Sequence, residues 1–375
     1  MRYLTFLAII GISISCQRKN NNQDSHNLLY AVDTVIIESK GRLLDLNRRL
    51  FFSDLNEEES SIFLFNTFDH SIDEVNLDNL EITNNFSFEV DGPDGTGEHI
   101  NNFNLSKDGS FFIKTFNKSA LFDRNGHLSI RIDWVNAVNS NGLKFGEFPR
   151  NEFLIDDNGL KVFGLSHDLE NRDVFLDILF FEDKKVKRFD IDPKKSYHNF
   201  VLTVDNPMSF LDPFVHLRYE NNFIIVSHQF SNELYLFNSK GEFVQIVNYE
   251  PKMTPKRVKD LIGDGISSDE QLKNEYQHFL EQVRFGPPVW DKEKKRYLRL
   301  SAKWNFKDRR KEDALLPEIQ EVEVYLSIFD AEFNLISESA ISELNSEFVK
   351  YFAKDGKLWV YQNFSDELGF IVINF

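Results

Sequence analysis

The sequence predicts an all-β protein, a six-bladed β-propeller whose blades are four-stranded antiparallel sheets. Three observations lead to this prediction. A pattern of short strands and turns recurs along the chain at a nearly constant spacing. Turns of the Asp-Gly and Asn-Gly type separate short apolar runs, which is typical of β-hairpins. Phenylalanine, which favours strands, accounts for 38 of the 375 residues.

The N-terminal segment has the features of a lipoprotein signal. Leu4–Ile14 is an apolar run that follows Arg2 and precedes Ser15 and Cys16. As a helix it is about 16 Å long, roughly half of a bilayer core, so it is too short to span a membrane. We therefore interpret residues 1–15 as a signal peptide and Cys16 as the lipidated residue. The alternative for Cys16 is an ordinary buried thiol.

Residues 16–28 are predicted to be a polar tether and residues 29–375 the propeller domain. The tether has no apolar residue between Gln17 and Asn27 with which to bury surface. No cysteine follows Cys16, which excludes disulfides and thiolate metal sites from the domain. The formal net charge of −17 disfavours phosphate binding. We therefore expect membrane lipid as a partner through Cys16, and no nucleic acid.

Each repeat is marked by an apolar strand that ends in phenylalanine and leads into a polar turn. The markers are Phe65, Phe122, Phe181, Phe237 and Phe329. The first three spacings between them are 57, 59 and 56 residues, and the fourth is 92. Upstream lie pairs of strands with the character of hairpins: His99–Leu105 with Ser110–Thr115, Glu152–Ile155 with Leu160–Leu165, and Phe214–Tyr219 with Phe223–Ser227. Four short strands per repeat are the composition of a propeller blade.

The two ends of the sequence are predicted to share the sixth blade. Glu347–Phe352, Lys357–Tyr361 and Gly369–Phe375 are expected to be its first three strands. Val32–Ile37 has strand composition and no other partner, so we expect this N-terminal strand to close the last blade. The alternatives are a stack of unrelated hairpins or a two-sheet sandwich. Agreement between register, repeat count and end pairing favours the ring.

The excess length in the fifth repeat, about residues 252–284, is predicted to be a small helical insertion. Thr254-Pro255 fits a helix start, because proline is favoured at the first helical position. Ser268 and Gln271 have the spacing of a capping box. An apolar stripe follows at helical spacing: Leu272, Tyr276, Phe279, Leu280 and Val283. We expect a pair of helices that plugs or stiffens one face of the ring, in preference to a moving lid.

Motifs for catalysis or cofactor binding are not found, so we predict no catalytic residues, no metal and no cofactor. Gly95-Thr96-Gly97-Glu98 lacks the third glycine of a dinucleotide fingerprint and is better interpreted as a loop between blades. Histidines in or near different repeats are the candidates for a metal site in a central channel. They are His99, His167, His198, His216 and His228. Each is isolated in sequence, so surface or singly bonded histidines are the expected case.

Candidate ligand-binding residues come from the loops that join one blade to the next, because these loops crowd one mouth of a propeller channel. The candidates are His99, Arg150, His198, Arg284 and Trp290. Arginine and aromatic side chains of this kind can recognise an anionic or sugar-like ligand. The alternative is that Trp290 and Phe285 pack beneath the helical insertion.

Several segments resemble a known family. They are the blade pattern itself, Asp91–Glu98 at the opening of a repeat, and Pro287–Lys292 followed by Lys295–Arg299. They are similar to those of uncharacterised Bacteroidetes-type lipoproteins built on a domain of unknown function, related to six-bladed propellers of the NHL and TolB kind. The resemblance covers essentially the whole mature chain. It implies a propeller fold and a place in the cell envelope, and it supplies no catalytic residues.

The function predicted from these observations is that of a membrane-anchored envelope lipoprotein, in the outer membrane, facing the periplasm or the cell surface. It acts as a binding or scaffold propeller with a protein or glycan ligand. The competing class is a propeller hydrolase or lyase acting on a glycan or peptide at the channel mouth. An enzyme requires titratable groups that converge in a pocket, whereas a channel lined by apolar and neutral residues excludes it. A purely structural role predicts an exposed apolar patch.

Overall fold

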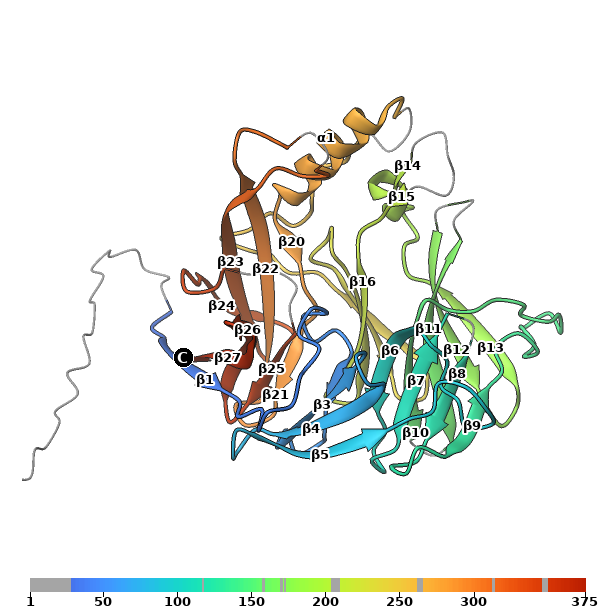
Figure 1. Cartoon of the computed structure of the whole chain (residues 1–375). Helices are drawn as coiled ribbons and strands as arrows, with labels where there is room; N and C mark the ends of the chain where they lie inside the picture. The colour runs from blue at the N-terminus through green and yellow to red at the C-terminus, as the bar shows by residue number, and fades with distance from the viewer. Residues whose placement is uncertain are drawn as a thin grey trace, which may run out of the picture.

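The computed structural model describes residues 28–375 except 117, 157–158, 169–170, 172, 204–209, 262–265, 312–313 and 346–349. The predicted signal peptide, Cys16 and nearly all of the tether lie outside the described residues. The described chain is a six-bladed β-propeller of antiparallel blades (Figure 1). The predicted fold class is therefore confirmed.

The first three blades take their strands in sequence order from the channel to the rim. Blade one contains β2 (Ser53–Leu55), β3 (Ser61–Asn66), β4 (Ser71–Asn76) and β5 (Glu81–Ser87). Blade two contains β6 (Ile100–Leu105), β7 (Phe111–Thr115), β8 (Ser119–Phe122) and β9 (Leu128–Ile132). Blade three contains β10 (Asn151–Asp156), β11 (Leu160–Asp168), β12 (Asp173–Phe180) and β13 (Lys185–Asp190).

Blade four repeats this order and blade five modifies it. Blade four contains β16 (Val215–Glu220), β17 (Phe223–His228), β18 (Leu234–Asn238) and β19 (Phe243–Val247). Blade five contains β20 (Arg284–Phe285), β21 (Val289–Asp291), β22 (Arg296–Phe306), β23 (Ile319–Phe329) and β24 (Leu335–Ala340). Both β20 and β21 pair with β22. The inner strand is split between them at Pro287-Pro288, because proline has no N–H to donate to the ladder.

Blade six joins the two ends of the described chain. It contains β25 (Tyr351–Lys354), β26 (Lys357–Phe364), β27 (Glu367–Asn374) and β1 (Ala31–Ile36). β1 pairs antiparallel with β27, with Ala31 opposite Asn374 and Ile36 opposite Gly369. Figure 1 accordingly places the C terminus beside β1. The prediction that an N-terminal strand closes the last blade is confirmed.

The hairpins predicted in the second, third and fourth repeats are confirmed by the pairs β6–β7, β10–β11 and β16–β17. One repeat marker, Phe65, lies on a different strand of its blade from the other markers. Phe65 lies on β3, the second strand of its blade, whereas Phe122, Phe237 and Phe329 lie on third strands. An apolar strand before a polar turn describes both strands of a hairpin equally well, so the pattern alone does not separate them.

In its described residues, the insertion between blades four and five contains one helix, α1 (Asp269–Leu280). The hydroxyl of Ser268 accepts the N–H of Gln271 (3.2 Å), as expected for an N-cap. The side chain of Gln271 accepts from the N–H of Ser267 (3.0 Å), not from that of Ser268 as in a capping box. Phe279 and Leu280 are buried, which confirms the centre of the predicted apolar stripe.

The expected helix at Thr254-Pro255 is absent from the described residues, so the prediction of a helical pair is wrong. The N–H groups of Lys252 and Met253 donate to the carboxylate of Glu338 in blade five. The N–H of Val258 donates to the carbonyl of Phe230 in blade four (2.9 Å). These contacts to two blades use the backbone groups with which a helix would have begun.

The connection from blade three to blade four contains η1 (Tyr197–Phe200), β14 (Leu202–Thr203) and β15 (Phe210–Leu211). The rings of Phe200 and Phe279 lie 6.0 Å apart, so η1 packs against α1. Both elements lie at the end of the ring that is uppermost in Figure 1, which we call the upper face. The lower face carries the turns between the first and second strand of each blade.

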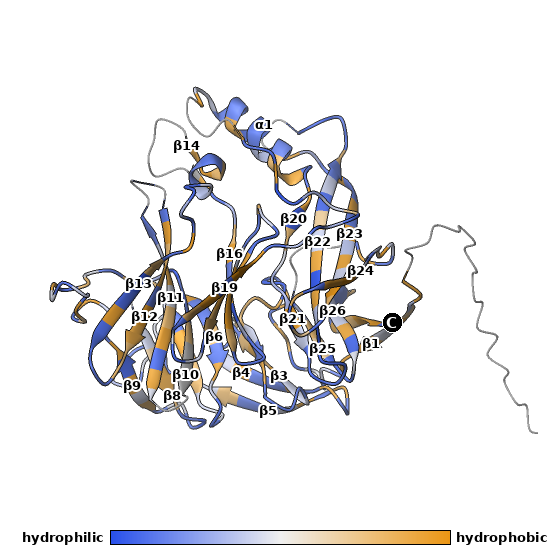
Figure 2. Cartoon of the chain, turned by 180° about the vertical axis from the view of Figure 1, so that it is seen from behind, coloured by the Kyte–Doolittle hydropathy of each residue, from blue (hydrophilic) through white to orange (hydrophobic). Residues whose placement is uncertain are grey.

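Apolar side chains fill the spaces between the blades, and Figure 2 shows them as the hydrophobic bands of the strands. An exception lies at the rim of blade four. There β19 leaves Phe243, Val244 and Ile246 about half-exposed. None of the helices in the described part of the chain is long and apolar enough to cross a membrane.

Candidate functional site: the central channel

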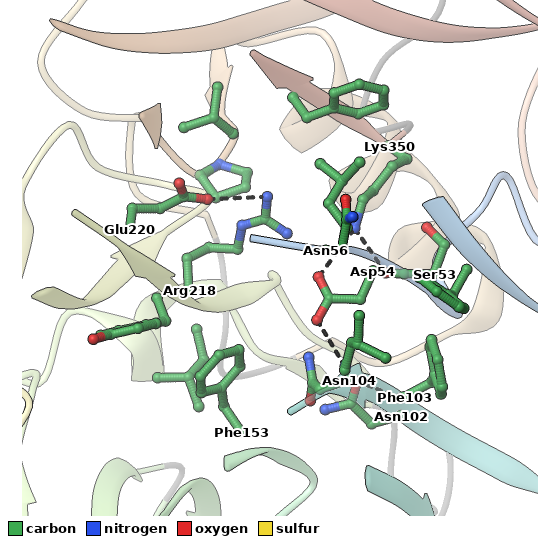
Figure 3. Close-up of a pocket in the computed structure, with 18 of the residues that line it drawn as sticks. Ser53, Asp54, Asn56, Asn102, Phe103, Asn104, Phe153, Arg218, Glu220 and Lys350 are labelled. Carbon is green, nitrogen blue, oxygen red and sulfur yellow. Dashed lines mark hydrogen bonds and ion pairs between the residues drawn. The ribbon is translucent and has the colours of Figure 1, made fainter. Parts of the chain in front are cut away.

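The inner strands of the six blades surround a cavity of about 1020 Å³ along the axis of the ring. Residues from every blade contribute to its wall, including parts of β2, β6, β10, β16, β21 and β25. Figure 3 shows a section of the wall in which Arg218 and Glu220 lie on one side and Asp54 and Lys350 on the other. Charged residues from three blades thus line one cavity.

Contacts between neighbouring inner strands fix the shape of this cavity. From blade one to blade three, Asp54 accepts the N–H of Leu105 (3.0 Å), and the amide of Asn102 donates to the carbonyl of Glu152. From blade four to blade six, Glu220 accepts the N–H of Trp290 (3.0 Å), and the Tyr351 hydroxyl donates to the carbonyl of Pro287. Lys350 joins blade six to blade one by donating to the carbonyl of Ser53 (2.7 Å). Between blades three and four, the rings of Phe153 and Tyr219 lie 5.7 Å apart. Each of the six boundaries between blades therefore carries a contact at the channel wall.

The alternation of β16 explains how a partly charged strand can line the channel. Successive side chains of a strand point to opposite faces. Leu217 and Tyr219 share one face and pack with the apolar residues of blade three. Arg218 and Glu220 share the other face with His216 and line the cavity. The sequence of β16 thereby serves a hydrophobic boundary and a polar wall at once.

Arg218 and Lys350 each form an ion pair within the wall. A guanidinium nitrogen of Arg218 lies 3.3 Å from Glu220 Oε1, and Lys350 Nζ lies 4.0 Å from Asp54 Oδ1. Burial raises the pKa of Glu220, and the charge of Arg218 opposes that shift. Burial together with the charge of Arg218 lowers the pKa of Lys350 to about 8, against the pull of Asp54 and Glu220.

Both ends of the cavity are narrowed by contacts that cross the ring. Near the upper face, the half-exposed rings of Phe51 and Phe214 lie 6.4 Å apart. Phe51 precedes the inner strand of blade one and Phe214 that of blade four, and these two blades lie on opposite sides of the ring. At the lower face, Lys292 of blade five lies 3.5 Å from Glu59 of blade one and donates to the carbonyl of Glu57 (3.1 Å). Burial raises the pKa of Glu59 to about 7, against the charge of Lys292.

The five residues predicted as a binding mouth are not brought together. Trp290 lines the cavity, where its ring packs 4.7 Å from that of Tyr297. Arg284 is fully buried, with its guanidinium over the rings of Trp304 (5.2 Å) and Phe279 (5.8 Å). The alternative of packing beneath the insertion named Trp290 and Phe285, and the structure shows such packing for Arg284, whose guanidinium contacts Phe279 of α1.

The other three candidates lie away from the cavity lining. Arg150 forms an ion pair with Asp212 (2.6 Å) in the connection to blade four. His198 is part of η1 on the upper face. His99 has an 84% exposed side chain, 3.9 Å from Glu98. In the described part of the chain, no three His, Cys, Asp or Glu side chains gather in a way that holds a metal ion.

Sequence reasoning missed the charged residues of the wall: Asp54, Arg218, Glu220 and Lys350. A signal existed for two of them, because Arg218 and Glu220 lie two apart in and beside the predicted inner strand Phe214–Tyr219. No local signal identifies Asp54, because the marker Phe65 implies the third strand of a blade, whereas it lies on the second strand of blade one. Lys350 precedes a short strand in which no alternation is visible.

Comparison with known proteins agrees with the fold. The model of a domain of unknown function, DUF4221, matches residues 25–340. A solved member of that family from Bacteroides vulgatus is 13% identical, covering 92% of this chain and 96% of that one, with a TM-score of 0.64. A putative exported protein from Bacteroides fragilis is 9% identical, covering 92% and 95%, with a TM-score of 0.47. None of the curated proteins matches the chain.

Proposed function

Because the chain belongs to the DUF4221 family of propellers, we propose that it is a lipid-anchored protein of the cell envelope that binds a polar ligand in its central channel. The observation that carries this proposal is the cavity of about 1020 Å³, lined from all six blades by charged, amide and aromatic side chains. Ligand sites in proteins are concave and place a few polar groups among apolar ones. The function is argued from this site, because the fold alone hosts many functions.

The proposed location, the outer membrane facing the periplasm or the surface, is supported by the sequence around Cys16. The apolar run before it and the polar segment after it fit a lipidated cysteine and a tether. The first strand begins at Ala31, so the connecting segment spans at most about 55 Å when fully extended. An anchor at Cys16 thus keeps the propeller close to the membrane, with blade six nearest to it.

The anchor is tested by Cys16→Ala in the full chain. We expect the variant to appear in the soluble fraction or as an uncleaved precursor, because no thiol remains to be acylated. Ser13→Ala, which leaves the cysteine in place, is the matched control and should remain with the membranes. Membrane association of Cys16→Ala equal to that of the wild type would contradict the proposal.

The ligand site is tested by affinity capture from native envelopes with two versions of the lipidated protein. One is the wild type and the other carries Asn104→Trp, which adds bulk at a cavity-lining position. A saccharide or protein that is retained by the wild type and lost from the variant is the expected result. Equal recovery from both versions, with equal melting temperatures, would place binding outside the channel.

A propeller hydrolase or lyase is the second candidate, and one observation favours it. A channel lined by apolar and neutral residues would have excluded catalysis, but the cavity contains Glu220 with a raised pKa and Lys350 with a pKa of about 8. A carboxyl group whose pKa is raised and an amine whose pKa is lowered can exchange protons with a bound substrate more readily than ordinary ones. Product release from a glycan or peptide that is lost in Glu220→Gln but not in Glu338→Gln would support this candidate. Retention of a ligand without turnover would favour binding alone.

A further inference from the structure

Within the proposed channel function, on which this step rests, we infer that the ligand is a short saccharide that carries a carboxylate, and that Arg218 and Lys350 hold that carboxylate. Arg218 belongs to blade four and Lys350 to the segment before blade six, and both line the same cavity. Figure 3 shows the two side chains in the wall of the pocket with the ion-paired carboxylates beside them.

The balance of hydrogen-bond donors and acceptors points to an anionic group. Both oxygens of Glu220 are engaged, one by Arg218 and the other by the N–H of Trp290. Arg218 has five N–H donors, and its Nε has no hydrogen-bond partner among the described residues. Lys350 has three donors, one of which goes to the carbonyl of Ser53. The cations therefore have donors to spare, and charge-assisted bonds to a carboxylate would use them.

The same charges argue against a polyanion. Six cationic residues and eight carboxylates line the cavity, so it attracts an anion through directed N–H groups and not through net charge. At the lower mouth, the exposed carboxylates of Glu57, Glu58 and Asp108 outnumber the exposed lysines, which are Lys107 and Lys292. A ligand with one carboxylate per sugar meets this pattern, whereas sulfated or phosphorylated chains are repelled by it.

Amide and aromatic side chains identify the remainder of the ligand as a sugar. Asn104 lines the cavity, and its Oδ1 is buried without a partner among the described residues, so it can accept a hydroxyl. Trp290 and Phe153 offer half-buried rings on which the apolar face of a sugar can pack. A peptide strand would add to free strand edges, but the inner edges already carry the contacts between blades.

Calorimetric titration of the full lipidated chain in detergent tests this inference. The probes are disaccharides that contain glucuronate, galacturonate, mannuronate or guluronate, each compared with its neutral hexose counterpart. At least one acidic disaccharide should bind at least about tenfold more tightly than its neutral counterpart, which corresponds to about 1.4 kcal/mol, because the neutral sugar cannot form the charge-assisted bonds. A peptide with a free C-terminal carboxylate is the competing ligand and should not bind.

Three variants assign the preference to residues. Arg218→Gln and Lys350→Gln should each reduce the preference for the acidic sugar to less than about threefold. Arg131→Gln removes the same charge from the exposed rim of blade two and should leave the preference unchanged. Melting temperatures establish that each variant is folded, and Arg218→Lys, which lacks the guanidinium fork, replaces Arg218→Gln if that variant unfolds.

Each contrary result would identify which part of the inference is wrong. Equal binding of acidic and neutral sugars, abolished by Asn104→Trp, would overturn the carboxylate assignment and leave the channel as the binding site. Sugar binding that survives Asn104→Trp would overturn the proposed channel function as well. Binding of the peptide alone, or of none of the disaccharides, would overturn the saccharide assignment.

Discussion

Arg299 joins blades four and five from a fully buried position. Its guanidinium donates to the carbonyls of Asn232 (2.8 Å) and Ser231 (3.3 Å) in blade four and of Gly286 (2.8 Å) in blade five. One side chain thereby satisfies three backbone oxygens that have been removed from water. Substitution by an apolar residue would leave those oxygens without a partner at a boundary that borders the channel.

We predict that Arg299→Met lowers the free energy of unfolding by about 1–3 kcal/mol, the usual cost when buried acceptors lose their donor. Urea unfolding followed by circular dichroism measures the change. Arg131→Met, at an exposed rim position, is the control and should change stability by less than about 0.5 kcal/mol. Similar effects of the two substitutions would show that the carbonyl contacts contribute little.

Lys350 predicts a pH dependence whose sign follows from its lowered pKa. Its pKa is about 8 in the folded chain and 10.5 in an ordinary environment. Between these values the unfolded chain binds more protons, so stability rises with pH across this window. The difference in urea midpoint between the wild type and Lys350→Met should therefore shift in favour of the wild type from pH 8 to 10.5. A difference that is constant with pH would contradict the assignment.

Among the elements, α1 depends on its cap because much of its surface faces solvent. The N-cap bond runs from the N–H of Gln271 to the hydroxyl of Ser268. Ser268→Ala should cost about 1 kcal/mol and raise hydrogen exchange in the first turn of the helix. Ser268→Asp keeps an acceptor at the cap and should retain the protection. Equal exchange in both variants would mean that packing at Phe279 alone holds the helix.

The sequence predicts the hairpins well because their turns are local. Strands such as β6 and β7 are joined by Lys107-Asp108-Gly109, and Gly109 adopts the positive φ of 83° that such a turn requires. Phe65 shows the limit of the same reasoning, since local pattern does not say which strand of a blade it marks. The false helix start at Thr254-Pro255 fails for a related reason. The carboxylate of Glu338, distant in sequence, holds that backbone.

The channel site is harder to predict from the sequence, because its residues come together only when the ring closes. Asp54 and Lys350 are separated by nearly the whole domain, yet their charged atoms lie 4.0 Å apart. Their proximity depends on blades six and one being neighbours. Arg218 and Glu220 are the part of the site that the sequence can predict, because strand alternation alone places them on one face.

For the whole molecule, the contact that closes the ring is the pairing of β1 with β27. The N–H of Ile37 donates to the carbonyl of Leu368 (2.8 Å) just beyond this pair. In an antiparallel ladder the donors alternate, so Asp33 points its N–H toward β27. The neighbouring Thr34 points its N–H away, where it donates to the side chain of Asp33 (2.8 Å).

Proline scanning of β1 tests this closure. Asp33→Pro should lower the free energy of unfolding by about 1–3 kcal/mol more than Thr34→Pro, because it removes a donor from the ladder. The two variants are matched in position and in backbone restriction. Unfolding midpoints in urea provide the measurement. Equal midpoints would show that β1 contributes little to holding blade six together.

The pairing of β1 with β27 also sets the order of events during biosynthesis. The ribosome makes Ala31–Ile36 early and Glu367–Asn374 only after the other five blades. The nascent chain therefore cannot complete its ring until late in translation, and closing so long a loop is slow. In the envelope location proposed above, the chain would cross a membrane before it folds, and this delay would keep it competent for transport. The same delay leaves unpaired strands exposed, which makes early intermediates clients for chaperones.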